Sequence, residues 1–310
     1  MATEPLVTVD GLVVRRGSFT LDIPHWEVPP GQVVGIVGPN GAGKTTTVRM
    51  LTGLLSPSSG RAVVCGVRLP LTDEGVTLRR KVGLLTEQPG LYDRLTAREN
   101  LRFFTRLHEL DEKKTWALAS EYLKRFGLNG REDEPVGGFS KGMRQKLAIV
   151  RTLLHQPEVI FLDEPTSGLD PQSARTVRDA VAELAADGRT LVLCSHNLAE
   201  VERLCTRVAV IKNRLRTVSS LKDLRQEGLA LELTLEGAAA RFLPALAALP
   251  FAPAAQAEGP KLKVTLSLDA QAPEVVAALV GAGARVHSVV RAARPLEEAY
   301  LELVREEDDA

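Results

Sequence analysis

The sequence predicts an α/β protein with a mainly parallel core sheet, antiparallel N-terminal strands, a helical subdomain and a small α/β C-terminal appendage. Short apolar runs alternate with helical patterns over residues 158–215, which is the order that builds a parallel sheet. Residues 91–155 instead follow helical periodicity throughout. The last part of the chain has a strand–helix–strand–helix–strand order. We therefore expect one large domain over residues 5–225, with its helical subdomain at about 91–155, and a second domain over residues 228–310.

The first 90 residues favour short strands joined by tight turns. Apolar and β-branched residues cluster in short runs, and segments rich in Pro and Gly separate them. Strands are expected at 6–9, 12–14, 32–37, 61–64 and 82–85, with turns at 29–31 and 57–60.

Two helices are expected in the helical subdomain before its last third. Thr96 and Glu99 have the spacing of a capping box, and apolar residues recur on one helical face after them. A second helix is expected over 112–126, ended by Gly127.

The C-terminal domain is expected to combine three strands with Ala-rich helices. The strands are expected at 229–235, 262–268 and 285–290, and the helices at 238–249, 273–280 and 296–306. The Pro- and Ala-rich stretch 250–260 predicts a mobile linker. His287 stands alone there and is interpreted as structural.

A glycine-rich string follows the expected strand 32–37. It reads Gly-Pro-Asn-Gly-Ala-Gly-Lys-Thr from Gly38 onward. Glycines let main-chain N–H groups approach a phosphate, Lys44 can reach β- and γ-phosphates, and the Thr45 hydroxyl can ligate Mg²⁺. A helix that begins at Lys44 points its N-terminal N–H groups at the same anion. The alternative is a glycine-rich turn that holds no ligand.

Two carboxylates follow the apolar run 159–162. A buried strand that ends there places Asp163 and Glu164 at the carboxyl edge of the sheet, where ligands of open α/β sheets bind. Asp163 is expected to hold Mg²⁺, and Glu164 to orient and polarise an attacking water. The alternative is a solvated Asp-Glu pair that opens a turn at Pro165.

Composition excludes several classes of function. Lys plus Arg and Asp plus Glu both number 39, so the formal net charge is zero and no basic field favours nucleic acid. The scattered Cys65, Cys194 and Cys205 have no metal-ligand spacing and are expected to be buried, reduced thiols, as in a cytoplasmic protein. No signal-peptide pattern is visible, and no apolar run approaches the ~20 residues of a membrane helix. A function at a membrane therefore requires a separate membrane protein.

Five features in this order resemble the nucleotide-binding subunit of an ATP-binding-cassette (ABC) transporter. They are the glycine-rich string at Gly38, Gln88, the string Phe-Ser-Lys-Gly-Met from Phe139, the pair Asp163–Glu164, and His196. The resemblance covers about residues 5–220 strongly and the tail weakly. It implies the P-loop NTPase fold of an ABC ATPase domain, ATP and Mg²⁺ as cofactors, and ATP hydrolysis as the reaction.

The resemblance also implies roles for single residues. His196 is expected to contact the γ-phosphate and to fix Glu164 and the water, and Gln88 to touch Mg²⁺ or that water. The implied catalytic residues are Glu164, His196, Gln88 and Lys44, and the implied Mg²⁺ ligands are Thr45, Gln88 and Asp163. Without the other motifs, Gln88 is a polar loop residue and His196 a surface or core histidine.

Nucleotide binding is expected along the glycine-rich string and at one upstream residue. In the family an aromatic residue that stacks on adenine commonly lies upstream of the string, and here Arg16 stands in its place, with Phe19 as the other candidate. The expected nucleotide-binding residues are Gly38, Pro39, Asn40, Gly41, Ala42, Gly43, Lys44, Thr45, Thr46 and Arg16.

The resemblance implies a head-to-tail dimer. The signature residues Ser140, Lys141, Gly142 and Met143 are expected to contact the ATP held by a second copy, and Ser167 and Asp170 to contact that copy. Lys141 and Met143 depart from the usual glycine and glutamine. From the residues alone, Ser140 caps an amphipathic helix and Asp170 caps a helix that begins at Pro171.

The implied partner is a polytopic membrane permease, with the chain attached peripherally to the cytoplasmic face of the membrane and no nucleic acid bound. Candidates for the permease contact are Leu91, Tyr92, Phe103 and Phe104, which can equally pack in the core of the subdomain. The ending Arg294–Leu301 resembles ATPase subunits of one exporter branch, so we expect an exporter. The alternatives are an importer ATPase with a regulatory tail and a soluble ABC ATPase that acts on DNA or ribosomes.

Overall fold

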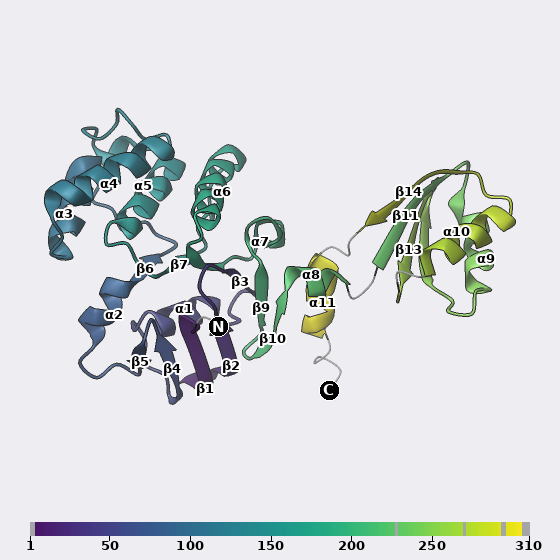
Figure 1. The fold of residues 1–310 in the computed structure, drawn as a ribbon, viewed down its shortest axis with the longest axis horizontal. Coiled ribbons are helices and arrows are strands. Elements are labelled where there is room, and N and C mark those ends of the chain that lie inside the picture. The colour runs from purple at the N-terminus through teal and green to yellow at the C-terminus, as the bar shows by residue number, and fades with distance from the viewer. Residues whose placement is uncertain (1–3, 227–228, 269–270, 293–295, 306–310) are drawn as a thin grey trace. The chain divides into compact units, whose positions relative to one another are not determined.

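The computed structural model describes residues 4–226, 229–268, 271–292 and 296–305. The chain forms two compact units, residues 1–219 and 220–310. Each unit combines helices with β-sheet (Figure 1).

An antiparallel sheet lies at the N-terminal end of the first unit. Its strand order is β2-β1-β4-β5. Two expected strands, 6–9 and 12–14, are one continuous strand, because Gly11 takes a left-handed φ of 57° and the pairing with β4 shifts register between Asp10 and Val13. The pairing with β2 keeps one register from Val7 to Arg16, and β2 itself was not predicted. The strands are β1 (Val7–Arg16), β2 (Phe19–Val28), β4 (Ser59–Val64) and β5 (Val67–Leu69).

A six-stranded sheet forms the centre of the first unit and confirms the predicted fold class. Its order is β10-β9-β3-β8-β7-β6, and the pairs from β9 to β6 are parallel. All five residues of β3, β7 and β8 are buried, as expected for strands that are covered on both faces. The strands are β3 (Val33–Val37), β6 (Val82–Leu85), β7 (Val159–Asp163), β8 (Thr190–Cys194), β9 (Arg207–Ile211) and β10 (Leu215–Ser220). The helices between them are α1 (Lys44–Leu51), α2 (Gly75–Lys81), α6 (Pro171–Ala186) and α7 (Leu198–Leu204).

The helical subdomain is inserted between β6 and β7. The predicted capping box is confirmed: Thr96 Oγ1 accepts from Glu99 N at 3.1 Å, and Glu99 Oε2 accepts from Thr96 N at 2.8 Å. The second helix ends as expected, since Gly127 follows it with a φ of 67°. The helices are α3 (Ala97–Leu107), α4 (Glu112–Arg125), the 3₁₀ turn η1 (Val136–Gly138) and α5 (Lys141–Leu153).

The second unit contains an antiparallel sheet with helices on one face (Figure 1). Apolar residues of β11 and β13 pack with α9 and α10 in a single core. The sheet order is β12-β13-β11-β14, with β11 (Leu229–Leu235), β12 (Ala254–Glu258), β13 (Lys261–Leu266) and β14 (Val286–Ala292). The helices are α8 (Leu221–Gln226), η2 (Ala239–Phe242), α9 (Leu243–Ala247), α10 (Ala272–Gly281) and α11 (Leu296–Arg305).

The linker predicted at 250–260 is wrong, because most of it is strand β12. Ala255 and Ala257 pair with Val264 and Leu262 of β13 and pack against the core of the unit. Their alternation with exposed neighbours is that of an edge strand, which the Pro and Ala content concealed. The expected helix 238–249 is divided into η2 and α9, and Glu306, Arg294 and Pro295 lie outside the described residues.

Cys65, Cys194 and Cys205 are buried free thiols, as expected. Burial raises the pKa of Cys65 to about 12. Among the described helices, none combines the length and the apolar composition needed to cross a membrane.

Candidate active site

The glycine-rich string forms the loop between β3 and α1. Gly43 is the N-cap of α1 and has a left-handed φ of 106°. At Gly38 an added Cβ would lie 2.1 Å from the Ile211 carbonyl oxygen, so only glycine fits there. The loop therefore needs these glycines to turn from a buried strand into a helix whose first N–H groups are free to bind an anion.

Lys44 places a positive charge inside this loop. Its side chain is buried, and its Nζ donates to Gly38 O at 2.8 Å and to Pro39 O at 3.1 Å. Gly38 and Pro39 thus hold the ammonium group with their carbonyl oxygens, while residues 40–46 line the adjoining cavity. The ammonium group lies where negative phosphate oxygens need it.

Thr45 and Asp163 form a pair of hard oxygen ligands. Thr45 Oγ1 donates to Asp163 Oδ1 at 3.1 Å. Burial raises the pKa of Asp163, which the Thr45 hydrogen bond opposes and the charges of Glu164 and Glu87 reinforce. A hydroxyl beside a desolvated carboxylate fits Mg²⁺, which prefers oxygen ligands and would relieve that desolvation.

Glu164 follows β7 and contacts His196, which follows β8. Glu164 Oε2 lies 2.8 Å from His196 Nδ1, and the Glu164 side chain is only 15% exposed while His196 is 61% exposed. Glu164 has a left-handed φ of 51°, a conformation that costs a non-glycine residue free energy and is concentrated at functional sites. The parallel strands β7 and β8 are neighbours, which is why two residues distant in sequence meet here.

Lys44, Thr45, Glu164 and His196 line one cavity of about 530 Å³, whereas Asp163, which accepts from Thr45, is not among its described lining residues. Its described lining residues are Phe19, Asn40, Gly41, Ala42, Gly43, Lys44, Thr45, Thr46, Glu87, Glu164, Ser167 and His196.

Two of the predicted site residues, Arg16 and Gln88, are not among the lining residues described for this cavity. The exposed Arg16 ends β1 outside the lining, whereas its strand partner Phe19 lines the cavity beside Gly43. Gln88 is also outside the lining, and its neighbour Glu87 lines the cavity instead. The β1–β2 hairpin sets the position of Arg16, and the conformation of the loop after β6 sets the position of Gln88. Neither conformation can be derived from a short sequence motif.

A buried carboxylate beneath the site was missed by sequence reasoning. Glu200 is 2% exposed and accepts from Ser195 Oγ at 2.7 Å and from Thr166 Oγ1 at 3.0 and 3.1 Å. Ser195 precedes His196, and Thr166 lies in the loop that begins with Glu164. Glu200 therefore ties the two catalytic loops together. Its position three residues after the N-cap Asn197 was the available sequence signal.

The signature residues lie at the start of α5. Ser140 Oγ accepts from Met143 N at 3.2 Å, so Ser140 caps the helix as expected. A Cβ on Gly142 would lie 2.7 Å from Ser173 Cβ, so this glycine allows α5 and α6 to pack closely. Lys141 lines a second cavity of about 560 Å³ together with Gln88 and residues 167–169. Ser140–Met143 are absent from the described lining of the cavity that holds Lys44.

Ser167 and Asp170, the two residues expected to contact a second copy, follow the Asp163–Glu164 pair in the chain. Ser167 lines both cavities. Asp170 Oδ1 accepts from Gln172 N and Ser173 N at 3.0 Å each, and hydrogen bonding, first from the Ser173 side chain, lowers the pKa of Asp170. Asp170 therefore caps α6 whatever else it contacts.

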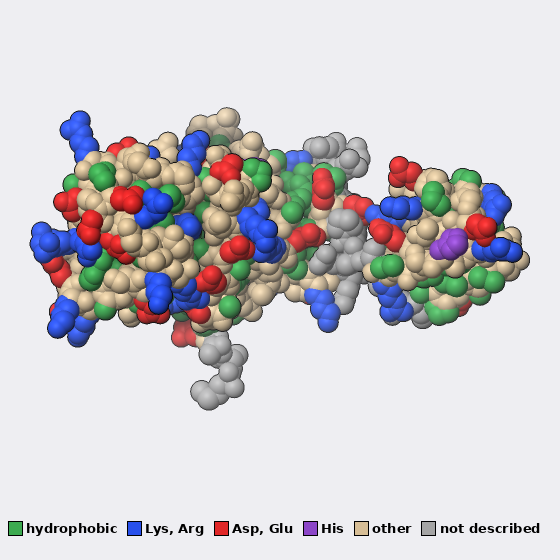
Figure 2. Space-filling view, turned by 90° about the horizontal axis from the view of Figure 1, so that it is seen from above, with side chains coloured by type: hydrophobic (Ala, Val, Ile, Leu, Met, Phe, Trp, Pro, Cys, Tyr) green, Lys and Arg blue, Asp and Glu red, His purple; other side chains and the backbone are tan. Residues whose placement is uncertain are grey.

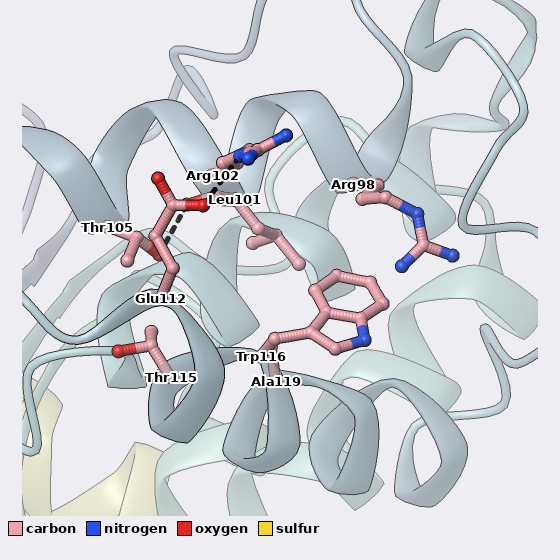
Figure 3. Close-up of a pocket in the computed structure, with 8 residues that line it drawn as sticks. All are labelled: Arg98, Leu101, Arg102, Thr105, Glu112, Thr115, Trp116 and Ala119. Atoms are coloured by element: carbon pink, nitrogen blue, oxygen red, sulfur yellow. Dashed lines mark hydrogen bonds and ion pairs between the residues drawn. The ribbon is translucent and has the colours of Figure 1, made fainter.

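A smaller pocket of about 210 Å³ lies between α3 and α4 (Figure 3). Its charged side chains are paired: Arg102 bonds Glu112 at 2.8 Å, and the Arg98 guanidinium lies 4.1 Å from the centre of the Trp116 ring. None of the predicted site residues lines it among the residues described. We therefore assign the chemistry to the cavity around Lys44.

Comparisons with known proteins agree with this assignment. The ABC transporter family matches residues 21–167. The chain is 43% identical over 199 residues to the ABC transporter ATP-binding protein NatA of Bacillus subtilis, which covers 64% of this chain and 77% of that protein. It is 37% identical over 214 residues to the Nod factor export ATP-binding protein I of Ralstonia nicotianae, with 69% and 66% covered. A solved ATP-binding subunit of an ABC transporter superposes with a TM-score of 0.63 and 33% identity, covering 71% of this chain and 92% of that one.

Proposed function

The chain belongs to the family of ABC transporter ATP-binding proteins, and from this premise we propose that it powers a separate membrane permease that exports its substrate. It is an ATP-binding ATPase subunit. The observation that carries the proposal is the 2.8 Å contact of Glu164 with His196 beside the glycine-rich loop.

The geometry supports distinct roles in hydrolysis. The N–H groups of the loop and Lys44 bind and orient the phosphates, and Thr45 and Asp163 are placed to hold Mg²⁺. When bound, Mg²⁺ neutralises charge on the phosphate oxygens. Glu164 accepts a proton from the water that attacks the γ-phosphorus, the bond to the bridging oxygen of ADP breaks, and His196 holds Glu164 in position.

A second copy of the chain is part of the proposal. Ser140–Met143 begin a helix whose N–H groups and Ser hydroxyl suit an anion, yet they do not line the described part of this chain's own phosphate cavity. In a head-to-tail dimer, the Ser140–Met143 segment of each copy contacts the nucleotide bound by the other copy. Ser167 and Asp170 then lie near the dimer interface.

An exposed aromatic cluster in the helical subdomain supports contact with the permease. Tyr92 and Phe103 are 48% and 41% exposed, and the Phe103 ring centre lies 5.1 Å from that of Tyr92 and 5.2 Å from that of Phe104. The Asn100 side chain binds both backbone groups of Tyr92, at 2.8 and 3.0 Å. A permease seated here places the chain peripherally at the cytoplasmic face of the membrane. The half-buried Leu91 also fits this contact.

Export is favoured over the alternatives by the relatives and by the charge distribution. One similar protein is named for export, and the chain's ending suggests the same branch. Side chains of both charge signs are interspersed on the face seen in Figure 2, which suits a protein partner better than nucleic acid. An importer ATPase with a regulatory tail is the alternative that the same site would serve.

Affinity capture tests the proposal. The tagged Glu164→Gln chain is captured from detergent-solubilised host membranes with ATP present. The control is a tagged Lys44→Ala chain, which should not bind ATP and therefore should not form the ATP-bound dimer. Recovery of a polytopic membrane protein, dependent on Lys44, supports the proposal. Recovery of ribosomes or DNA without a membrane protein contradicts it.

A further inference from the structure

Two adjacent polar residues of the loop after β6, Glu87 and Gln88, differ in the cavities that they line. Glu87 lines the cavity of Lys44, and both residues line the one beside Lys141. Backbone contacts fix this arrangement: Thr86 Oγ1 donates to Gln88 O at 2.6 Å, and Arg151 Nη1 donates to Pro89 O at 2.6 Å and to Gly90 O at 3.0 Å. The position of Glu87 is therefore fixed by a hydrogen bond within the loop, from Thr86, and by hydrogen bonds from Arg151 of α5.

Sheet register places Glu87 level with Glu164. Leu85 of β6 pairs with Leu162 of β7, so Glu87 and Glu164 are each two residues beyond a paired position. Neighbouring strands are about 4.8 Å apart, so two carboxylates at equal height beyond such strands lie in one region. Both residues line the same cavity.

Charge in this region is strongly unbalanced. Glu164 and Glu87 line the cavity, and Asp163 accepts a hydrogen bond from its lining residue Thr45. The charge of Glu87 is among the causes that raise the pKa of Asp163, after burial, while the charge of Arg49 opposes them. Among the described lining residues the only Lys or Arg is Lys44, whose ammonium group is bound to Gly38 and Pro39. A triphosphate alone enters this cavity against carboxylate repulsion, and a bound divalent cation reduces that repulsion because it neutralises two of the negative charges.

We propose that Glu87 is a second carboxylate ligand, beside Asp163, of the divalent cation that accompanies the nucleotide, and that its charge makes nucleotide binding depend on that cation. This inference rests on the proposed function of the site. A glutamine at this place could offer an oxygen ligand, but no repulsion toward metal-free nucleotide. Removal of the Glu87 charge should therefore have two effects of opposite sign: weaker metal binding and stronger binding of metal-free nucleotide.

Binding measurements without turnover test both effects. Affinity for a fluorescent ATP analogue is measured in EDTA and across a Mg²⁺ titration, and Mn²⁺ binding is followed by electron paramagnetic resonance. For Glu87→Gln we expect metal affinity to fall about tenfold and metal-free nucleotide affinity to rise a few-fold. Glu87→Asp, which keeps the charge, should stay near wild type in EDTA. Glu258→Gln, at an exposed carboxylate of β12, is the matched control and should leave both affinities unchanged, and Gln88→Ala tests the other candidate ligand of the same loop.

The outcomes separate this inference from the function on which it rests. A Glu87→Gln chain that binds nucleotide with wild-type metal dependence overturns the role of Glu87 and leaves the ATPase site intact. A Gln88→Ala chain that alone loses metal affinity also overturns it and assigns the ligand to Gln88. A wild-type chain that binds no nucleotide even with Mg²⁺ overturns the site itself.

Discussion

The two units of the chain both combine a sheet with helices, but they cover the sheet differently. In the first unit β3, β7 and β8 are buried along their whole length. In the second, residues of β13 alternate between buried and more exposed, and helices cover one face. A parallel sheet covered on both faces brings the carboxyl ends of its strands to one edge, where Lys44, Glu164 and His196 meet. The antiparallel sheet turns at both ends and gathers no comparable set among the described residues.

The largest expected effect is on the rate of ATP hydrolysis, which should respond to a Glu→Gln substitution in the first unit but not in the second. Glu164→Gln should lower the rate of ATP hydrolysis about 1000-fold, equivalent to about 4 kcal/mol, because the amide cannot accept the proton of the attacking water. ATP binding should persist. The same substitution at the exposed Glu258 of β12 should leave steady-state hydrolysis unchanged. Equal losses at both positions would mean that the chemistry does not depend on the edge of the parallel sheet.

The next effect tests whether the units are stable independently. Leu233→Ala removes a side chain from the core of the second unit and should destabilise that unit by about 3 kcal/mol. Hydrogen exchange followed by mass spectrometry should speed up in peptides from 229–266 and stay unchanged in those of the first unit. Leu268→Ala, at a position 64% exposed, is the control. Faster exchange around Lys44 would show that the two cores are coupled.

Within the first unit, substitution of Glu200 should affect both the stability of the fold and the rate of hydrolysis. Glu200→Ala removes the acceptor shared by Thr166 and Ser195, and should cost about 2 kcal/mol of stability and slow hydrolysis through misplacement of Glu164 and His196. Glu200→Gln should restore most of both, measured by denaturant unfolding and phosphate release. A stability loss with unchanged turnover would reduce Glu200 to a purely structural residue.

The pH dependence of the same variant has a defined sign. Burial raises the pKa of Glu200 in the folded chain, so its contribution to stability is fully present below the ordinary carboxyl pKa and decreases as pH rises through the folded pKa. The stability of wild type relative to Glu200→Gln should therefore fall over that range. A difference that grows with rising pH would contradict the burial argument.

The smallest effect separates capping from dimer contact. Asp170→Ala removes the cap of α6, and Asp111→Ala removes the cap of α4, where Asp111 Oδ1 accepts from Lys114 N at 2.7 Å. Both should lower the melting temperature by about 2–4 °C. Only Asp170→Ala should also weaken ATP-dependent dimerisation, measured by light scattering on the Glu164→Gln background. Equal dimerisation in both variants would limit Asp170 to its capping role.

Local patterns predicted the site well where the chemistry is carried by consecutive residues. The string from Gly38, the pair Asp163–Glu164 and the cap at Ser140 each depend on one turn of chain, and the structure places them accordingly. Glu87 and Glu200 were not predicted, because their positions depend on hydrogen bonds to residues far away in sequence. Strand β12 was missed for a similar reason: its alanines form a strand only because β13 pairs with them.

The helix α5 joins two of these distant places. Ser140 caps its first turn, and Arg151, in its last turn, holds the backbone of the loop that carries Glu87. Its 13 residues make a rod about 20 Å long. A rod of this stiffness transmits a displacement at one end to the other. In the proposed dimer, we therefore expect contact of Ser140 with the nucleotide of the second copy to be linked to metal binding beside Glu87, and such a linkage acts equally in both directions.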